Sequence, residues 1–232
     1  MIRYNPGVGP FPQNWLSIDN GPLVVNEIEQ QQITLFNNYY KAEDEERQKE
    51  IDETLNHNLC NINIDKIVIL TEDATPQRDL EIIKLDHRPT YSDFFEIAHK
   101  YSGIKIIANS DIYFDESLKL IKNADLTNIV LCITRWDWVR DRFVEILNYG
   151  SNDTWVFTDV KINANWTMGR LGCDSLVAMA LHKVGYKLYN PAMVLKTYHN
   201  HKSNLRTSDC GKPPFALDSD KVAGVKFTGI IK

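Results

Sequence analysis

Cysteine is scarce in this chain, and its spacing excludes the motifs in which it commonly does chemistry. The 232 residues contain four cysteines, none in a Cys-x-x-Cys pair: Cys60, Cys132, Cys173 and Cys210. A zinc ribbon or a dithiol redox motif needs such close pairs. The wide spacing instead favours free thiols in a reducing compartment.

An excess of positive charge is also missing. Lys and Arg number 26 against 31 Asp and Glu, which gives a formal net charge of −5. No overall positive field therefore attracts nucleic acid, and we expect no nucleic-acid partner. The negative charge of an anionic ligand would have to be bound locally, by a metal ion or by one or two arginines.

Long apolar runs are absent as well. No window approaches the roughly 18–20 apolar residues of a membrane span, and residues 1–6 (MIRYNP) lack the apolar core of a secretory signal. The 43% hydrophobic and 25% charged content is ordinary for a globular protein. We therefore expect no membrane span and a soluble protein of the cytoplasm, which would be host cytoplasm for a viral chain.

What is present divides into an arm and one domain. Residues 1–30 are rich in Pro, Gly, Asn and Gln, and predict an irregular arm with one short strand at 22–25. Residues 31–232 contain no internal repeat and no low-complexity linker, and are enough for one sizeable core. The sequence leaves open whether this domain belongs to a larger protein with further domains.

Short apolar segments alternate with amphipathic ones up to residue 134. The apolar segments predict buried strands at 32–36, 64–70, 82–85, 104–108 and 128–134. Helical spacing predicts helices at 42–59, 91–99 and 116–123. The dense charges of the first helix, with Arg47 and Glu50 among them, are expected on its solvated outer face. The alternation predicts an α/β fold with a mostly parallel central sheet flanked by helices.

The pattern changes after residue 150. Segment 153–158 predicts a short aromatic strand or turn, and 186–191 and 193–198 are strand-like. Between them, a glycine-bearing loop at 169–174 opens a helix that runs through Val184. Gly185 follows, where a helix end favours glycine.

The strand at 104–108 ends abruptly in Asn109-Ser110-Asp111. Ligands of open α/β sheets bind at the carboxyl ends of the strands. A carboxylate there can hold a divalent cation, and the cation can hold a diphosphate. The alternative is that Asp111 only caps a turn.

His199 and His201 alternate on an extended segment, so both side chains can point to one face. Such a pair is either a pair of metal ligands or structural and exposed. Combined with Asp111, a mixed carboxylate and imidazole site suits Mn²⁺ better than a site made of oxygen ligands alone.

Two carboxylates are candidates for the general base. Asp174 lies in the first turn of its expected helix, where it can act as a base or simply complement the helix dipole. Asp153 is its rival, because it also lies beside an aromatic residue, Trp155. Trp155 and Trp166 either stack on a sugar or belong to the core.

Arginines are the local cations that would suit phosphate, because a guanidinium can make two parallel hydrogen bonds to it. Arg88 and Arg206 are the candidates, and the alternative for each is an ordinary surface position. Glu72 and Asp73 follow a strand, where they either contact a base or ribose or cap the loop.

Four segments together resemble the nucleotide-sugar glycosyltransferases of the GT-A fold, in particular small viral and bacterial members that build polysaccharides. The segments, in the family's order within residues 31–206, are Asn109-Ser-Asp-Ile-Tyr-Phe-Asp115, Gly150-Ser-Asn-Asp-Thr-Trp-Val-Phe157, Gly172-Cys-Asp174 and the stretch from Pro191 to Tyr198-His-Asn-His201. This chain departs from the family's DxD motif, because Asn109 stands in place of the first Asp and leaves Asp111 as the only carboxylate of the motif. The resemblance implies a GT-A fold and transfer of a sugar from a nucleotide-diphosphate donor to a hydroxyl of a glycan acceptor.

The resemblance also implies roles for individual residues. Asp111 with His199 or His201 would hold Mn²⁺ or Mg²⁺, and Asp174 would be the base of an inverting transfer. Since no second carboxylate is placed as a covalent nucleophile, inversion is favoured. The residues expected around the donor nucleotide are Phe36, Asn37, Glu72, Arg88, Tyr91, Asn109, Ser110 and Asp111.

Two other functions remain open at this stage. A sugar-1-phosphate nucleotidyltransferase would carry a glycine-rich, lysine-containing loop after its first strand, and residues 37–41 (NNYYK) have no glycine. A non-catalytic carbohydrate- or nucleotide-binding module would keep aromatics and lose carboxylates, whereas Asp111, Asp153 and Asp174 are all present.

Overall fold

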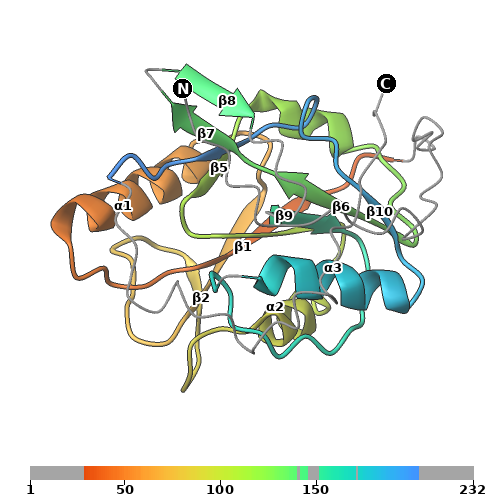
Figure 1. Cartoon of the computed structure of the whole chain (residues 1–232), viewed down its shortest axis with the longest axis horizontal. Coiled ribbons are helices and arrows are strands. Elements are labelled where there is room, and N and C mark those ends of the chain that lie inside the picture. Colours follow the sequence, from red (N-terminus) through yellow and green to blue (C-terminus); the bar gives the residue numbers. More distant parts are fainter. Residues whose placement is uncertain (1–28, 140–141, 146–151, 171, 204–232) are drawn as a thin grey trace, which may run out of the picture.

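The computed structural model describes residues 29–139, 142–145, 152–170 and 172–203, and in them two β-sheets are flanked by helices (Figure 1). The expected strand at 22–25 and Arg206 lie outside these residues. The α-helices are α1 (Glu45–Leu59), α2 (Tyr91–Ala98) and α3 (Cys173–Lys183), and a 3₁₀ helix, η1, covers Glu116–Ile121. The expected single domain at 31–232 stays a prediction.

The larger sheet has the strand order β10-β6-β9-β4-β1-β2-β3. Its strands, in chain order, are β1 (Ile33–Asn38), β2 (Lys66–Thr71), β3 (Glu81–Lys84), β4 (Ile104–Ala108), β6 (Ile129–Thr134), β9 (Asn152–Phe157) and β10 (Lys187–Tyr189). Neighbours run parallel except at β9, which is antiparallel to both β4 and β6. The predicted mostly parallel sheet flanked by helices is confirmed.

Both faces of this sheet are covered, which is why its central strands carry continuous apolar runs, such as Ile104–Ala108 in β4. One hydrophobic cluster joins the sheet to α2 and α3 through Phe94, Phe95 and Val177. The cluster on the other face includes Leu55 of α1 and Leu118 of η1. Figure 1 shows α2 and α3 beside each other below the sheet, with α1 apart from them.

Helix α1 contradicts one expectation. Asp44 caps it by accepting a hydrogen bond from the Arg47 backbone N–H (3.0 Å), as an N-cap aspartate does. The side chains of Arg47 and Glu50, however, are buried, with relative exposures of 8% and 7%. They are therefore not part of a solvated face, because they lie on the inner side of the helix together with Ile51.

The second sheet, with the order β5-β11-β7-β8, was not predicted. Its strands are β5 (Ile112–Phe114), β7 (Trp136–Val139), β8 (Arg142–Glu145) and β11 (Thr197–His199). They have only three or four residues each, too few for a period-two pattern to stand out. The strand expected at 193–198 is accordingly shorter and begins later, at Thr197.

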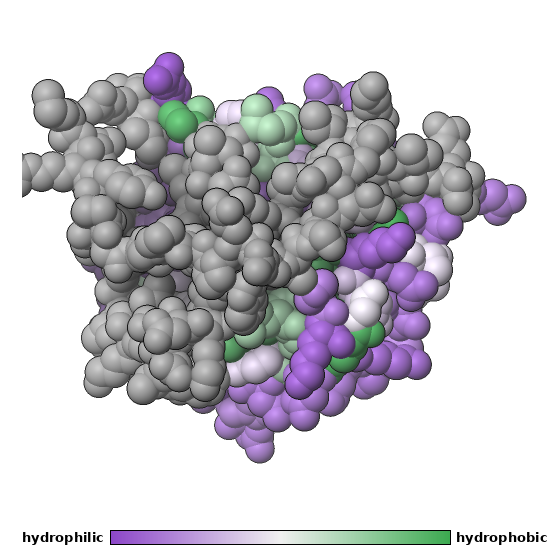
Figure 2. Space-filling view, turned by 45° about the vertical axis from the view of Figure 1, so that its right-hand side comes forward, coloured by the Kyte–Doolittle hydropathy of each residue, from purple (hydrophilic) through white to green (hydrophobic). Residues whose placement is uncertain are grey.

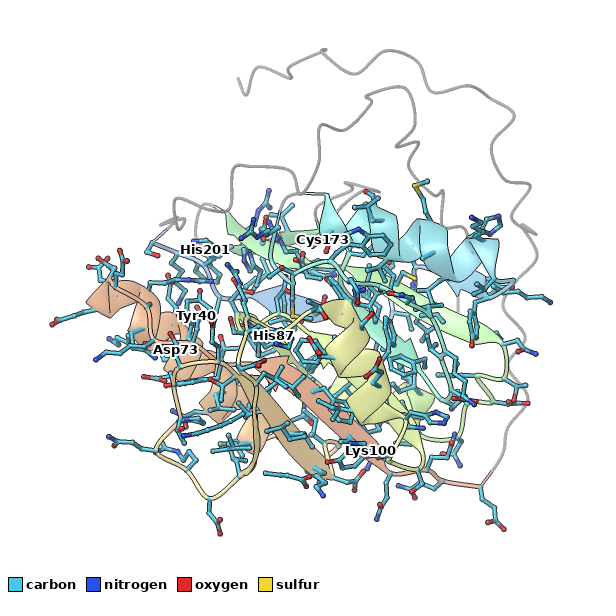
Figure 3. The ribbon with its side chains drawn as sticks, turned by 90° about the horizontal axis from the view of Figure 1, so that it is seen from below. Tyr40, Asp73, His87, Lys100, Cys173 and His201 are labelled. Atoms are coloured by element: carbon cyan, nitrogen blue, oxygen red, sulfur yellow. The ribbon has the colours of Figure 1, made fainter. Side chains whose placement is uncertain are left out.

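The small sheet lies at the carboxyl ends of the large one, because β5 follows β4 and β7 follows β6 after short connections. Figure 3 shows the same polarity: Tyr40 and Asp73, which follow β1 and β2, lie at one end of the molecule. Lys100, which precedes β4, lies away from both of them, low in the view. The site residues gather at the end marked by Tyr40.

The exposed side chains of the described residues are mostly polar (Figure 2). Among the residues described, no helix is both long and apolar enough to cross a bilayer. The coloured part of Figure 2 is mostly hydrophilic, with small apolar patches between. Large apolar side chains are exposed singly, for example Ile62, Val184 and Met193, as is normal for a globular protein.

Candidate active site

The structure brings Asp111, His199 and His201 together. One possible ligand atom from each lies within 4.8 Å of the others. Asp111 Oδ2 is 3.1 Å from His199 Nε2 and 4.0 Å from His201 Nδ1. The strand register explains the meeting, because His199 on β11 is paired with Ile112, the residue after Asp111. Figure 3 shows His201 near α1 at the same end of the molecule as Tyr40.

These donor atoms fit a divalent cation. Bonds of about 2.1 Å to one ion put neighbouring ligand atoms roughly 3 to 3.4 Å apart, so the observed spacings require only small side-chain movements. One carboxylate and two imidazoles suit Mn²⁺ and similar metals. Asp111 and His199 are both buried, at 8% exposure each, so the ligands are held in place by their surroundings.

Asp137 orients His199. Its Oδ1 lies 2.7 Å from His199 Nδ1, and since a carboxylate only accepts, Nδ1 carries a proton; Nε2, which faces Asp111 Oδ2 at 3.1 Å, donates in the same way when the ring is charged. The pairing of β11 with β7 sets Asp137 opposite His199. A carboxylate on the far nitrogen of a ligating histidine is the usual support of a metal site.

Arg47 is the other partner of Asp111. Its Nη2 donates to the same Oδ2 atom at 2.5 Å, and its Nη1 donates to Glu50 Oε2 at 3.1 Å. Burial alone would raise the pKa of Asp111, but the positive charges of His199 and Arg47 outweigh it and hold that pKa well below the usual range. Burial likewise works against a charged His199, yet Asp111 and Asp137 raise its pKa to about 9.

A half-buried arginine, Arg135, links this cluster to Asp153, one of the two candidate bases. Arg135 Nε donates to Asp137 Oδ1 (2.9 Å), and its Nη1 donates to Asp153 Oδ2 (3.0 Å). Asp153 Oδ1 accepts from Asn109 Nδ2 at 2.7 Å. Asn109 Oδ1 is buried without a hydrogen-bond partner among the described residues, so it can accept from a ligand.

Asp174 lies in the first turn of α3, after Gly172 in a left-handed conformation (φ 83°). It accepts hydrogen bonds from Tyr91 Oη (3.1 Å) and Cys173 Sγ (3.3 Å). Burial of the carboxyl, followed by the negative charge of Asp153, raises the pKa of Asp174 to about 8. The two candidate bases therefore interact electrostatically, and Figure 3 shows Cys173 at the end of α3 that carries Asp174.

The aromatic candidates lie in the core. Trp155 is fully buried and meets Tyr91 edge-to-face, with ring centroids 6.1 Å apart. Phe36 is fully buried against Tyr101, and Trp166 packs on the same cluster. The side chains of Phe36 and Tyr91 are thus enclosed by protein, and the Tyr91 hydroxyl serves Asp174.

The other residues expected around the nucleotide lie at the carboxyl edge of the sheet. Asn37 is buried and its Nδ2 donates to the Ala108 carbonyl (2.8 Å), while Ser110 is also buried. Glu72 and Asp73 are exposed after β2. Arg88 is partly buried and donates to the Met168 carbonyl (3.3 Å). Their contact with a nucleotide stays a prediction.

Sequence reasoning missed Arg47, Arg135 and Asp137. Arg135 and Asp137 directly follow β6, so the rule that singled out Asp111 after β4 could have found them. Arg47 precedes Ile51 by four residues and Leu55 by eight, which is the spacing of one helix face. That spacing was a signal for burial, hidden by the surrounding charges.

Comparisons with known proteins were made by sequence and by structure. No family model and no curated protein matches the sequence. Among solved structures, the mannosyltransferase PcManGT from Pyrobaculum calidifontis, in complex with GDP-Man and Mn²⁺, aligns with a TM-score of 0.52 and 12% identity. That alignment covers 76% of this chain and 59% of the mannosyltransferase.

Two further structures align less closely. TarS of S. aureus has a TM-score of 0.49 and 15% identity, covering 73% of this chain and 37% of its own. GalNAc-T7, solved with UDP, GalNAc and Mn²⁺, has a TM-score of 0.49 and 7% identity, covering 80% of this chain and 45% of its own. This chain thus spans less than two thirds of each of the three proteins. The likeness concerns the fold, and the chain has the GT-A fold.

Proposed function

We propose that this chain is a glycosyltransferase that moves a sugar from a nucleotide-diphosphate donor to a hydroxyl of a glycan acceptor. One observation carries the proposal. The cation-binding group Asp111, His199 and His201 and the candidate bases Asp153 and Asp174 gather at the carboxyl end of the sheet. The likeness of fold to a mannosyltransferase solved with GDP-Man and Mn²⁺ supports it.

In this proposal Asp111, His199 and His201 hold Mn²⁺ or Mg²⁺. A cation there supplies charge stabilisation for the departing diphosphate. Asn109, with its free Oδ1, accepts from a donor hydroxyl. Asn37, Ser110, Glu72 and Arg88 then surround the nucleotide, with Phe36 and Tyr91 behind them in the core.

Asp174 is the proposed general base. It takes the proton of the acceptor hydroxyl while that oxygen forms a bond to the anomeric carbon. The bond from the anomeric carbon to the donor phosphate oxygen breaks, and its electron pair leaves with the diphosphate. A single displacement of this kind inverts the anomeric configuration. Asp153, held by Arg135 and Asn109, positions the acceptor and keeps the pKa of Asp174 high.

A base pKa near the working pH favours proton transfer. The Asp174 pKa of about 8 meets that condition, whereas an ordinary aspartate would be a weak base. Polysaccharide synthesis, a hexose as the transferred sugar and a cytoplasmic location belong to this proposal as well, since the resemblance of the sequence suggests them.

The test is a panel of UDP-, GDP- and dTDP-sugars with purified protein, with and without Mn²⁺. We expect one donor to raise the melting temperature only with Mn²⁺, and to be slowly hydrolysed to the nucleoside diphosphate. Asp111→Ala should weaken that binding while leaving the fold intact. Consumption of a nucleoside triphosphate with release of pyrophosphate would instead identify a nucleotidyltransferase, and binding without any turnover a non-catalytic module.

A further inference from the structure

Asp111, the carboxylate of the proposed cation site, is already paired with a positively charged side chain, that of Arg47. Arg47 Nη2 lies 2.5 Å from Asp111 Oδ2, the oxygen that also faces His199 Nε2 at 3.1 Å and His201 Nδ1 at 4.0 Å. A divalent ion held by these three ligands needs that same oxygen. The guanidinium and the ion would therefore compete for it.

We propose that Arg47 is an exchangeable counter-ion of Asp111, which neutralises the carboxylate in the metal-free protein and is displaced by the divalent cation. This inference rests on the proposal that Asp111, His199 and His201 bind such a cation. It adds a residue that sets the affinity of the site and that neither the sequence motifs nor the resemblance assigns.

Glu50 is a second acidic partner for Arg47, besides Asp111. Its Nη1 donates to Glu50 Oε2 at 3.1 Å and to the Asn200 carbonyl at 3.4 Å. Glu50 is itself fixed, because its carboxylate accepts from the backbone N–H (2.7 Å) and hydroxyl (3.0 Å) of Ser203. Arg47 can thus release Asp111 and remain paired with Glu50 on the next turn of the same helix.

Electrostatics favours one positive partner for Asp111 at a time, either Arg47 or the metal ion. A buried carboxylate without a partner is costly, so Asp111 needs a positive neighbour whenever no metal is bound. The pair of Arg47 and Asp111 is nearly shielded from water, with side-chain exposures of 9% and 11%. Two cations on one oxygen repel each other strongly in such a place. Metal binding must therefore break a charge-assisted hydrogen bond, which weakens the apparent affinity.

The experiment measures the dissociation constant of Mn²⁺ alone, by electron paramagnetic resonance of the free ion, for the wild type and Arg47→Met. Removal of a competing charge-assisted hydrogen bond should tighten Mn²⁺ binding about tenfold or more. Lys49→Met is the matched control, since it removes the same charge from the same helix at a side chain 76% exposed. It should change the constant less than twofold.

Arg47→Lys covers the case in which the methionine variant does not fold. Lysine keeps the charge but cannot bridge Glu50 and Asp111 with a planar fork, so binding of Mn²⁺ should tighten by a smaller factor. In the wild type, titration with diamagnetic Mg²⁺ should shift the NMR resonances of the Arg47 side-chain N–H groups. The backbone N–H resonance of Lys49, whose side chain is exposed on the same helix, should stay unchanged.

Each outcome of these measurements either supports or refutes the exchange of Arg47 for the metal ion. If Arg47→Met binds Mn²⁺ no more tightly than the wild type, the exchange is refuted, whatever the donor panel gives. If neither protein binds Mn²⁺, the exchange is refuted as well, and donor turnover without metal would show that the proposed function still holds. Tighter Mn²⁺ binding by Arg47→Met without turnover of any donor would support the exchange and refute the function.

Discussion

The raised pKa of Asp174 predicts that the residue costs stability at the pH where it would work. Its pKa is about 8 in the folded chain, against 3.8 for an unperturbed aspartate. Between these values the unfolded chain ionises the group and the folded chain does not, so stability falls as the pH rises through this window. Each pH unit costs up to about 1.4 kcal/mol, with a ceiling near 5 kcal/mol at pH 8.

Asp174→Asn removes this cost and keeps an oxygen that can accept from the Tyr91 hydroxyl. Asp174 is partly exposed, so water screens part of the effect, and we expect a gain of about 2 kcal/mol at pH 8. In a chain of this size that corresponds to a rise in melting temperature of roughly 4–8 °C. At pH 5 the gain should shrink to about 1 kcal/mol or less, because little of the window has been crossed.

The assay is thermal unfolding of both proteins at pH 5, 6, 7 and 8, beside transfer or donor hydrolysis. The proposed base predicts opposite effects: the variant gains stability and loses roughly 10²-fold or more in kcat. Asp153→Asn is the internal control, expected to act through positioning of the acceptor. A variant of Asp174 less stable than the wild type at pH 8 would refute the electrostatic reasoning. Full transfer activity in both variants would refute a carboxylate base from this region.

Two further predictions concern the support of the site and the fold. Asp137→Asn should weaken Mn²⁺ binding about 10- to 100-fold, because it removes the carboxylate that fixes the tautomer of His199; an unchanged dissociation constant would show that the tautomer is set elsewhere. Gly103→Ala should destabilise by about 2 kcal/mol or more, since its Cβ would come within 2.4 Å of the Gln32 carbonyl oxygen at a φ of +74°. Gly185→Ala, with a φ of +100° and open space around it, should cost only about 1–2 kcal/mol, and equal losses in urea unfolding would contradict the role of the clash.

The sequence by itself determined the framework. Apolar runs such as 104–108 predict strands buried on both faces, because both faces of a parallel sheet must be covered. The polar residues directly after them, Asn109 to Asp111, marked the edge where the candidate site lies. The expected helices α1, α2 and α3 also formed, since their apolar spacing has the helical period.

Only the tertiary structure decided how the charges pair. Whether His199 meets Asp111 depends on the register of β11 in a sheet of three- and four-residue strands, which local pattern does not encode. Arg47 comes from a helix 64 residues before Asp111, and its burial reversed the expectation of a solvated face. The pKa of Asp174, on α3, likewise follows from burial and from the charge of Asp153 on strand β9. Contacts of this kind depend on distances between elements far apart in the chain. The sequence therefore determines which ionisable groups are present, and the fold determines how they pair and how their pKa values shift.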